Sequence, residues 1–189
     1  MKILHLDTTH PFLGKELEKI GFTNYYDFKT IKSDLKISDF FGIIIRSRIS
    51  IDKNFIDKCK NLKFIARIGS GIENIDVDYA KQKGIQIIST PEGNSNAVGE
   101  HALGMLLSIL NNINSSNTEV KKGIWNRESN RGIELKNKTV GLIGYGNTGK
   151  SFAKKLNGFD VNTIFYDIKK IKKDNYANPV SLNYLKDNS

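Results

Sequence analysis

A single cysteine, Cys59, is present among the 189 residues. No internal disulfide can therefore form, as is typical of proteins in a reducing compartment. No secretory signal is visible, because the apolar N-terminal segment 1–7 is short and ends on an acid. The longest apolar stretch, 97–113, contains Glu100 and His101 and is too short and too polar to cross a bilayer. These absences predict a cytoplasmic protein with no membrane partner.

Arginine is also scarce, with 5 residues against 24 lysines, although the net charge is +9. Residues 1–119 carry 15 basic and 14 acidic side chains, whereas residues 120–189 carry 14 and 6. A basic surface can attract nucleic acid, but recognition of bases and planar phosphates favours arginine. We therefore interpret the lysine cluster 169–173 as a solvated loop and expect no nucleic-acid partner.

Residues 1–90 alternate strand signals with helix signals and show no internal repeat. The apolar run within 40–46 is continuous, which is typical of a parallel strand buried on both faces. Strands separated by helices predict a parallel sheet with right-handed crossovers. The expected strands are 2–7, 40–46, 64–68 and 85–88, and the expected helices are 13–20, 52–59 and 77–83, the last two capped by Asp52 and Asp76.

A polar segment, 92–96, separates this region from a helix expected over 97–113. That helix is apolar on nearly all sides, and such a helix is expected to be buried. Small residues recur along it and would permit close approach of another helix or of a second subunit. The sequence therefore predicts two domains, 1–96 and 97–189.

The strongest motif is a Gly-x-Gly-x-x-Gly pattern between an apolar strand, 139–143, and a helix expected over 150–156. Gly144 allows the tight turn from strand to helix, and Gly146 lets the backbone approach a pyrophosphate. Gly149 lets the helix pack close to the strand. The helix N-terminus then offers free N–H groups to phosphates. The alternative is a glycine turn with a purely structural role.

A second apolar strand, 161–166, follows this helix and ends at Asp167. The Asp167 carboxylate would accept hydrogen bonds from the ribose hydroxyls of an adenosine, and it would repel a 2′-phosphate. NAD is therefore expected rather than NADP, although Lys169 and Lys170 would soften this preference. A complete doubly wound domain has six strands, and only the first two are expected within this sequence.

Several further segments occur in one order along most of the chain. They are 46–48, 62–71, 74–76, 84–87, 96–102, 123–126, 132–139 and 165–167, together with the glycine pattern. This set resembles the D-isomer-specific 2-hydroxyacid dehydrogenases, most closely those members that oxidise 3-phosphoglycerate in serine biosynthesis. The resemblance implies a flavodoxin-like, parallel-sheet α/β substrate domain, then the first part of a Rossmann NAD-binding domain, and a homodimer at full length.

The resemblance also implies which residues contact small molecules. The loop with Gly69, Ser70 and Gly71 would contact the substrate carboxylate through backbone N–H groups. Arg46 and Arg48 would lie near the far end of the substrate, where guanidinium groups suit a phosphate. The alternative is that one of them caps a strand end or pairs with an acid. Asn147 and Thr148 would contact the dinucleotide.

The catalytic Arg, Glu and His of the resembled family match no residue of this sequence. None of the three histidines, His5, His10 and His101, can be assigned that role, and no catalytic or metal-binding residue is predicted. His101 follows Glu100, but sequence neighbours on a helix point to different faces, so a structural role is expected. We expect the N-terminal part of a dehydrogenase, without dehydrogenase activity of its own. The alternative is a short, non-catalytic relative that binds a nucleotide or a partner.

Overall fold

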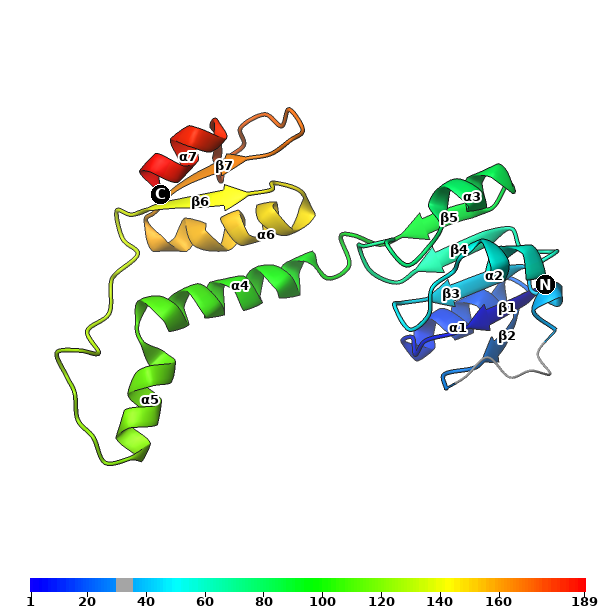
Figure 1. Cartoon of the computed structure of the whole chain (residues 1–189), viewed down its shortest axis with the longest axis horizontal. Coiled ribbons are helices and arrows are strands. Elements are labelled where there is room, and N and C mark those ends of the chain that lie inside the picture. The colour runs from blue at the N-terminus through cyan, green and yellow to red at the C-terminus, as the bar shows by residue number, and fades with distance from the viewer. Residues whose placement is uncertain (30–35) are drawn as a thin grey trace. The chain divides into compact units, whose positions relative to one another are not determined.

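The computed structural model describes residues 1–29 and 36–189 of the chain. These residues divide into two compact units, Met1–Gly93 and Asn94–Ser189 (Figure 1). Each unit has a parallel sheet and its own helices, so the expected α/β class is confirmed. No helix among the described residues is long and apolar enough to cross a membrane.

The first unit is built on five parallel strands in the order β2-β1-β3-β4-β5. This order is that of flavodoxin-like sheets, as the family resemblance implied. The sequence did not predict β2, a polar strand at the edge of the sheet. The strands are β1 (Lys2–His5), β2 (Thr23–Tyr26), β3 (Gly42–Ile45), β4 (Phe64–Arg67) and β5 (Gln86–Ser89), and the helices are α1 (Pro11–Lys19), α2 (Lys53–Lys58), α3 (Val77–Gln82) and the 3-10 turn η1 (Ile37–Asp39).

The core of the first unit lies on the face of the sheet that α2 and α3 cover. Alternate residues of the central strands, such as Ile43 and Ile45, pack there with Ile56 of α2 and Ala80 of α3. All four residues of β3 are buried, as its continuous apolar run predicted.

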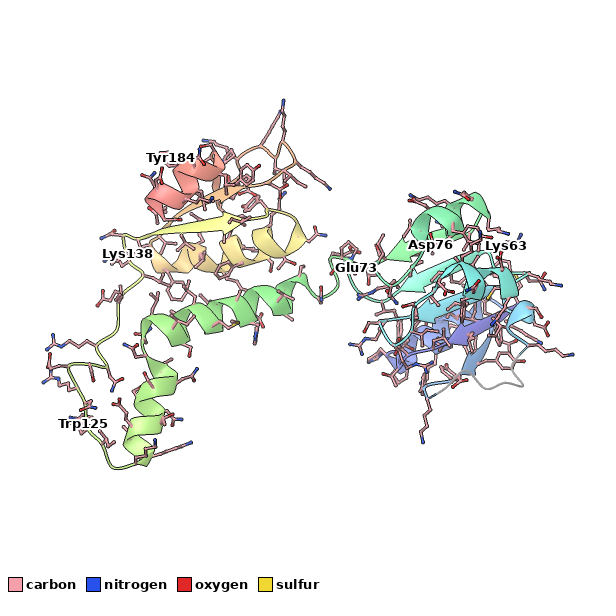
Figure 2. All side chains as sticks on the ribbon, viewed as in Figure 1. Lys63, Glu73, Asp76, Trp125, Lys138 and Tyr184 are labelled. Atoms are coloured by element: carbon pink, nitrogen blue, oxygen red, sulfur yellow. The ribbon has the colours of Figure 1, made fainter. Side chains whose placement is uncertain are left out.

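Both predicted N-caps of the first unit are present. The Asp52 carboxylate accepts a hydrogen bond from the Phe55 N–H at 2.8 Å, and Asp76 accepts one from the Tyr79 N–H at 3.0 Å. Asp76 is labelled in Figure 2. These caps satisfy N–H groups that a helix leaves free in its first turn, and so they define where α2 and α3 begin.

The second unit contains a smaller parallel sheet in the order β6-β7-β8. The two expected strands are present, but a third strand, β8, pairs with β7 and corrects the sequence prediction of only two. The elements are α4 (Ser95–Leu110), α5 (Ile113–Lys121), β6 (Thr139–Ile143), α6 (Asn147–Leu156), the 3-10 turn η2 (Asn157–Phe159), β7 (Asn162–Tyr166), β8 (Asn178–Pro179) and α7 (Leu182–Asn188).

The single buried helix expected over 97–113 is wrong in two respects. The chain forms two helices, because Asn112 between α4 and α5 has a φ of 51°, in the left-handed region. In addition, α4 lies along α6 (Figure 1), and Gly99, which packs against Ser151 of α6, is its only buried residue. Met105 and Ile109 of α4 are 54% and 71% exposed, so its apolar side chains are not all buried.

Candidate dinucleotide-binding site

The glycine pattern forms a tight turn between β6 and α6. Gly144 has a φ of 94°, which residues with a side chain rarely adopt, and its N–H donates to the Tyr166 carbonyl at 2.8 Å. A methyl group on Gly149 would overlap the Gly144 carbonyl oxygen, so this glycine brings α6 against the turn. A methyl group on Gly146 would meet no atom within 4 Å. The backbone at Gly146 therefore faces open space.

The helix α6 begins at Asn147, three residues earlier than the expected start at Lys150. Asn147 and Thr148 are exposed in its first turn. The N–H groups of a first helical turn lack intrahelical acceptors and carry the positive end of the helix dipole. This end of α6 can thus receive an anionic group beside the glycine turn.

Asp167 joins the glycine turn to the end of β7. One carboxylate oxygen accepts the Tyr145 N–H at 2.7 Å, and the other accepts the Lys169 N–H at 2.8 Å. The bond from Tyr145, followed by that from Lys169, holds the pKa of Asp167 below its ordinary value, so the group stays ionised at neutral pH. Each oxygen has a further lone pair, so Asp167 can still accept hydrogen bonds from two hydroxyls.

A pocket of about 370 Å³ opens next to Asp167 at the carboxyl ends of β6 and β7. Its walls combine apolar side chains with the exposed glycine backbone and one lysine, an arrangement that can hold a flat ring beside a polar sugar. The lining residues are Ile143, Gly144, Gly146, Tyr166, Asp167, Ile168, Lys169 and Ile171.

Sequence reasoning missed two residues, Tyr145 and Asp174, which are bonded to each other beside the glycine turn. Tyr145 is fully buried and stacks on Phe165 with 3.8 Å between ring centroids. Its hydroxyl donates to the Asp174 carboxylate at 2.8 Å, and burial is the main reason that the pKa of Tyr145 is raised. The one sequence signal for Tyr145 was its position as an aromatic residue between two glycines. A turn exposed to solvent rarely places a large aromatic ring there.

In the first unit, the predicted substrate arginines have different surroundings. The Arg48 guanidinium donates to the carbonyls of Leu6 at 2.7 Å and Asp27 at 2.8 Å, and its Nε lies 4.0 Å from an oxygen of Asp7. Arg48 thus caps strand ends and pairs with an acid, as the alternative interpretation described. The side chain of Arg46 is exposed, whereas its backbone N–H donates to Asp7 at 2.6 Å.

The loop with Gly69, Ser70 and Gly71 follows β4. Gly69 has a φ of 138°, and its N–H and carbonyl bond to the hydroxyl and the N–H of Thr90 at 3.1 and 3.0 Å. Ser70 is exposed, and Gly71 lies against the carboxylate of Glu73, which is labelled in Figure 2. The loop is therefore fixed at its base and open at its tip.

Arg67, at the end of β4, was not predicted as a site residue. Its guanidinium lies so close to Gly69 that a methyl group there would overlap Nη1. Its Nε is buried and has no hydrogen-bond partner among the described residues. A charged residue at the carboxyl end of a parallel strand is the sequence signal that would have identified it.

Two of the three histidines, His5 and His10, have local structural contacts. His5 is fully buried, with Nε2 at 2.8 Å from the Asn24 side-chain oxygen, and its burial lowers its pKa. His10 caps α1 by accepting the Phe12 N–H at 3.2 Å. His101 is exposed, which corrects the expectation that it lies on a buried helix. The described residues contain no cluster of side chains that could hold a metal ion.

The fold and the glycine turn define an α/β protein with a flavodoxin-like unit followed by a Rossmann-type βαβ unit. Comparison with known proteins gives the family. The model of the D-isomer specific 2-hydroxyacid dehydrogenase catalytic domain matches residues 3–178. The chain belongs to this family.

Individual relatives carry several activities. The chain is 36% identical over 168 residues to D-3-phosphoglycerate dehydrogenase of Methanocaldococcus jannaschii, a match that covers 88% of this chain and 32% of that protein. It is 38% identical over 143 residues to hydroxypyruvate reductase of Thermotoga maritima, which covers 76% of this chain and 47% of that protein. The chain thus spans less than half the length of these two relatives.

Two solved structures match the whole chain at 26% identity. A formate dehydrogenase of Staphylococcus aureus in complex with NAD gives a TM-score of 0.80, and the match covers 63% of its chain. An acyclic imino acid reductase in complex with NADPH and D-Arg gives a TM-score of 0.86, also over 63% of its chain. Both nicotinamide dinucleotides therefore occur among proteins of this fold.

Proposed function

We propose that this chain forms the dinucleotide-binding part, and one edge of the substrate site, of an NAD-dependent 2-hydroxy acid dehydrogenase. The observation that carries the proposal is the glycine turn bonded to an ionised Asp167 beside an open pocket. The turn and the first residues of α6 would hold the pyrophosphate, and Asp167 would hold the adenosine ribose. The nicotinamide, when bound, would supply the hydride transfer.

NAD is the proposed cofactor because Asp167 carries a negative charge at the pocket. An ionised carboxylate accepts hydrogen bonds from ribose hydroxyls but repels a 2′-phosphate. Lys169 lines the same pocket, and its positive charge reduces this repulsion but does not cancel it. We therefore expect NAD to bind more tightly than NADP.

The proposed substrate is a small 2-hydroxy acid, and 3-phosphoglycerate is the member that fits the charges best. The exposed guanidinium of Arg46 is available for a phosphate, whereas that of Arg48 is bonded to the protein itself. The loop at Gly69, Ser70 and Gly71 would contact the carboxylate. Oxidation to 3-phosphohydroxypyruvate would then place the full-length enzyme in serine biosynthesis.

The test is calorimetric titration of the 189-residue chain with NAD and with NADP, together with a Gly146→Asp variant. An aspartate at Gly146 would place a side chain and a negative charge where the pyrophosphate is proposed to lie, so we expect at least a hundredfold loss of NAD affinity, which corresponds to about 2.7 kcal/mol. A Gly104→Asp variant is the matched control, because Gly104 is exposed on α4 with open space around it.

Three outcomes would count against the proposal. Absence of NAD binding by the unmodified chain would reject the dinucleotide site. Equal binding by the Gly146→Asp variant would place the nucleotide elsewhere. Tighter binding of NADP than of NAD would reject the proposed role of Asp167.

A further inference from the structure

The segment 168–177 connects β7 to β8 and forms part of the pocket wall. It contains four lysines, at 169, 170, 172 and 173, and no helix or strand. Ile168, Lys169 and Ile171 line the pocket. Like charges so close in sequence repel one another, and this segment needs anchors if the wall is to keep one position.

One residue of the glycine turn bonds to both ends of this segment. The Tyr145 N–H donates to Asp167 at 2.7 Å, just before the segment begins. The Tyr145 hydroxyl donates to Asp174 at 2.8 Å, near the end of the segment. The Tyr145 ring is fully buried and stacked on Phe165, and this packing holds its hydroxyl in one position.

Asp174 also binds backbone N–H groups of the same segment. The oxygen that accepts the Tyr145 hydroxyl also accepts the N–H groups of Tyr176 at 2.9 Å and Ala177 at 3.2 Å. Burial opposes ionisation of Asp174, but these hydrogen bonds outweigh it and keep its pKa below the ordinary value. An ionised carboxylate makes stronger hydrogen bonds than a neutral acceptor.

We propose that Tyr145 and Asp174 are positioning residues that hold the segment 168–177 as the wall of the nucleotide pocket and thereby set the affinity for the adenosine half of the dinucleotide. This inference rests on the proposed function. When only a fraction of the molecules has the binding-competent wall, the apparent dissociation constant rises in proportion. The Tyr145–Asp174 bond keeps that fraction high before any nucleotide arrives.

The experiment compares a Tyr145→Phe variant with a Tyr79→Phe variant. The first keeps the stacked ring and removes only the hydroxyl. The second removes an equivalent hydrogen bond from the first unit, where the Tyr79 hydroxyl donates to the Asp57 carboxylate at 2.6 Å. Calorimetric titrations with NAD and with AMP, which represents the adenosine half alone, give the dissociation constants of the full 189-residue chain.

We expect Tyr145→Phe to weaken NAD and AMP about tenfold, equivalent to about 1.4 kcal/mol, while Tyr79→Phe leaves both within twofold. Two substitutions of the acceptor add a graded test. Asp174→Asn keeps a side-chain oxygen and is expected to retain most of the affinity, whereas Asp174→Ala removes the acceptor and is expected to lose at least as much as Tyr145→Phe. If Tyr145 and Asp174 acted on stability alone, Asp174→Asn and Asp174→Ala would not differ in their affinity for NAD and AMP.

Hydrogen exchange of the nucleotide-free chain provides the second readout. Amides of 168–177 should exchange faster in Tyr145→Phe, while those of β6 and α6 keep their protection. If exchange rises there but NAD and AMP bind as before, the inference is overturned and the proposed function stands. If the unmodified chain binds no nucleotide, the proposed function fails and this inference fails with it. If Tyr145→Phe loses protection throughout the second unit, the test passes to Asp174→Asn and Asp174→Ala. Their affinities for NAD and AMP and their exchange at 168–177 are then judged in the same way.

Discussion

The two units use the same type of parallel strand but bury it to different depths. In the first unit β3 has a strand on each side, and all four of its residues are buried. In the second unit β6 pairs only with β7 among the described strands, and Ile143 at its end is 72% exposed. The first unit therefore holds the larger core, whereas the second holds the open pocket and the glycine turn. The larger core and the candidate nucleotide-binding chemistry thus lie in different parts of the chain.

The largest effect should come from matched isoleucines at the ends of the two strands. Ile45 of β3 is fully buried, so Ile45→Ala should lower the free energy of unfolding of the first unit by about 2–5 kcal/mol. Ile143→Ala in β6 should change that of the second unit by no more than about 0.5 kcal/mol. Urea unfolding followed by hydrogen exchange of peptides from each unit measures both. Equal losses would show that burial does not separate the units.

An intermediate effect should distinguish the two arginines. Arg48→Ala removes the two hydrogen bonds that the guanidinium donates to backbone carbonyls and should cost about 1–3 kcal/mol of stability in the first unit. Arg46→Ala should leave stability within about 0.5 kcal/mol but weaken binding of 3-phosphoglycerate. Urea unfolding and calorimetric titration give the two quantities. If Arg46→Ala binds 3-phosphoglycerate as well as the unmodified chain does, Arg46 is not a substrate contact.

Parts of the fold with strong local signals could be predicted from the sequence. The strand β3 has a continuous apolar run, and α2 and α3 begin at aspartate caps. The strand β2 escaped prediction because its side chains are polar or exposed at the sheet edge. The two-residue strand β8 contains Pro179, which cannot donate a backbone hydrogen bond, and so it carries no strand signal.

The candidate site also contains features that the sequence could predict and features that it could not. The glycine turn at Gly144 is a local feature, because a positive φ and close helix packing demand glycine at set positions. The bond between Tyr145 and Asp174 joins residues 29 positions apart, and the Nε atom of Arg67 is buried where the loop at Gly69 lies against the guanidinium. Such contacts arise from tertiary packing, so neither spacing nor composition could reveal them.

The smallest expected effect is a difference between the units in how their stability depends on pH. Burial lowers the pKa of His5 in the first unit below 6.5. The unfolded chain then binds the proton more strongly, so the stability that neutral His5 contributes is complete above pH 6.5 and is lost as the pH falls toward the folded pKa. In the second unit, hydrogen bonds lower the pKa values of Asp167 and Asp174 below 3.8, so their contributions are lost only in stronger acid.

Between pH 6.5 and about pH 5 the first unit should therefore lose stability while the second does not, with a slope of at most about 1.4 kcal/mol per pH unit for one group. Hydrogen exchange of peptides from each unit across this range, corrected for the intrinsic pH dependence of exchange, measures the difference. In a His5→Gln variant, the side-chain amide can still donate to Asn24 but does not titrate, so the slope of the first unit should disappear. If both units lost protection in parallel, or if His5→Gln kept the slope, then another group would control the pH response, and the buried imidazole would not distinguish the two halves of the chain.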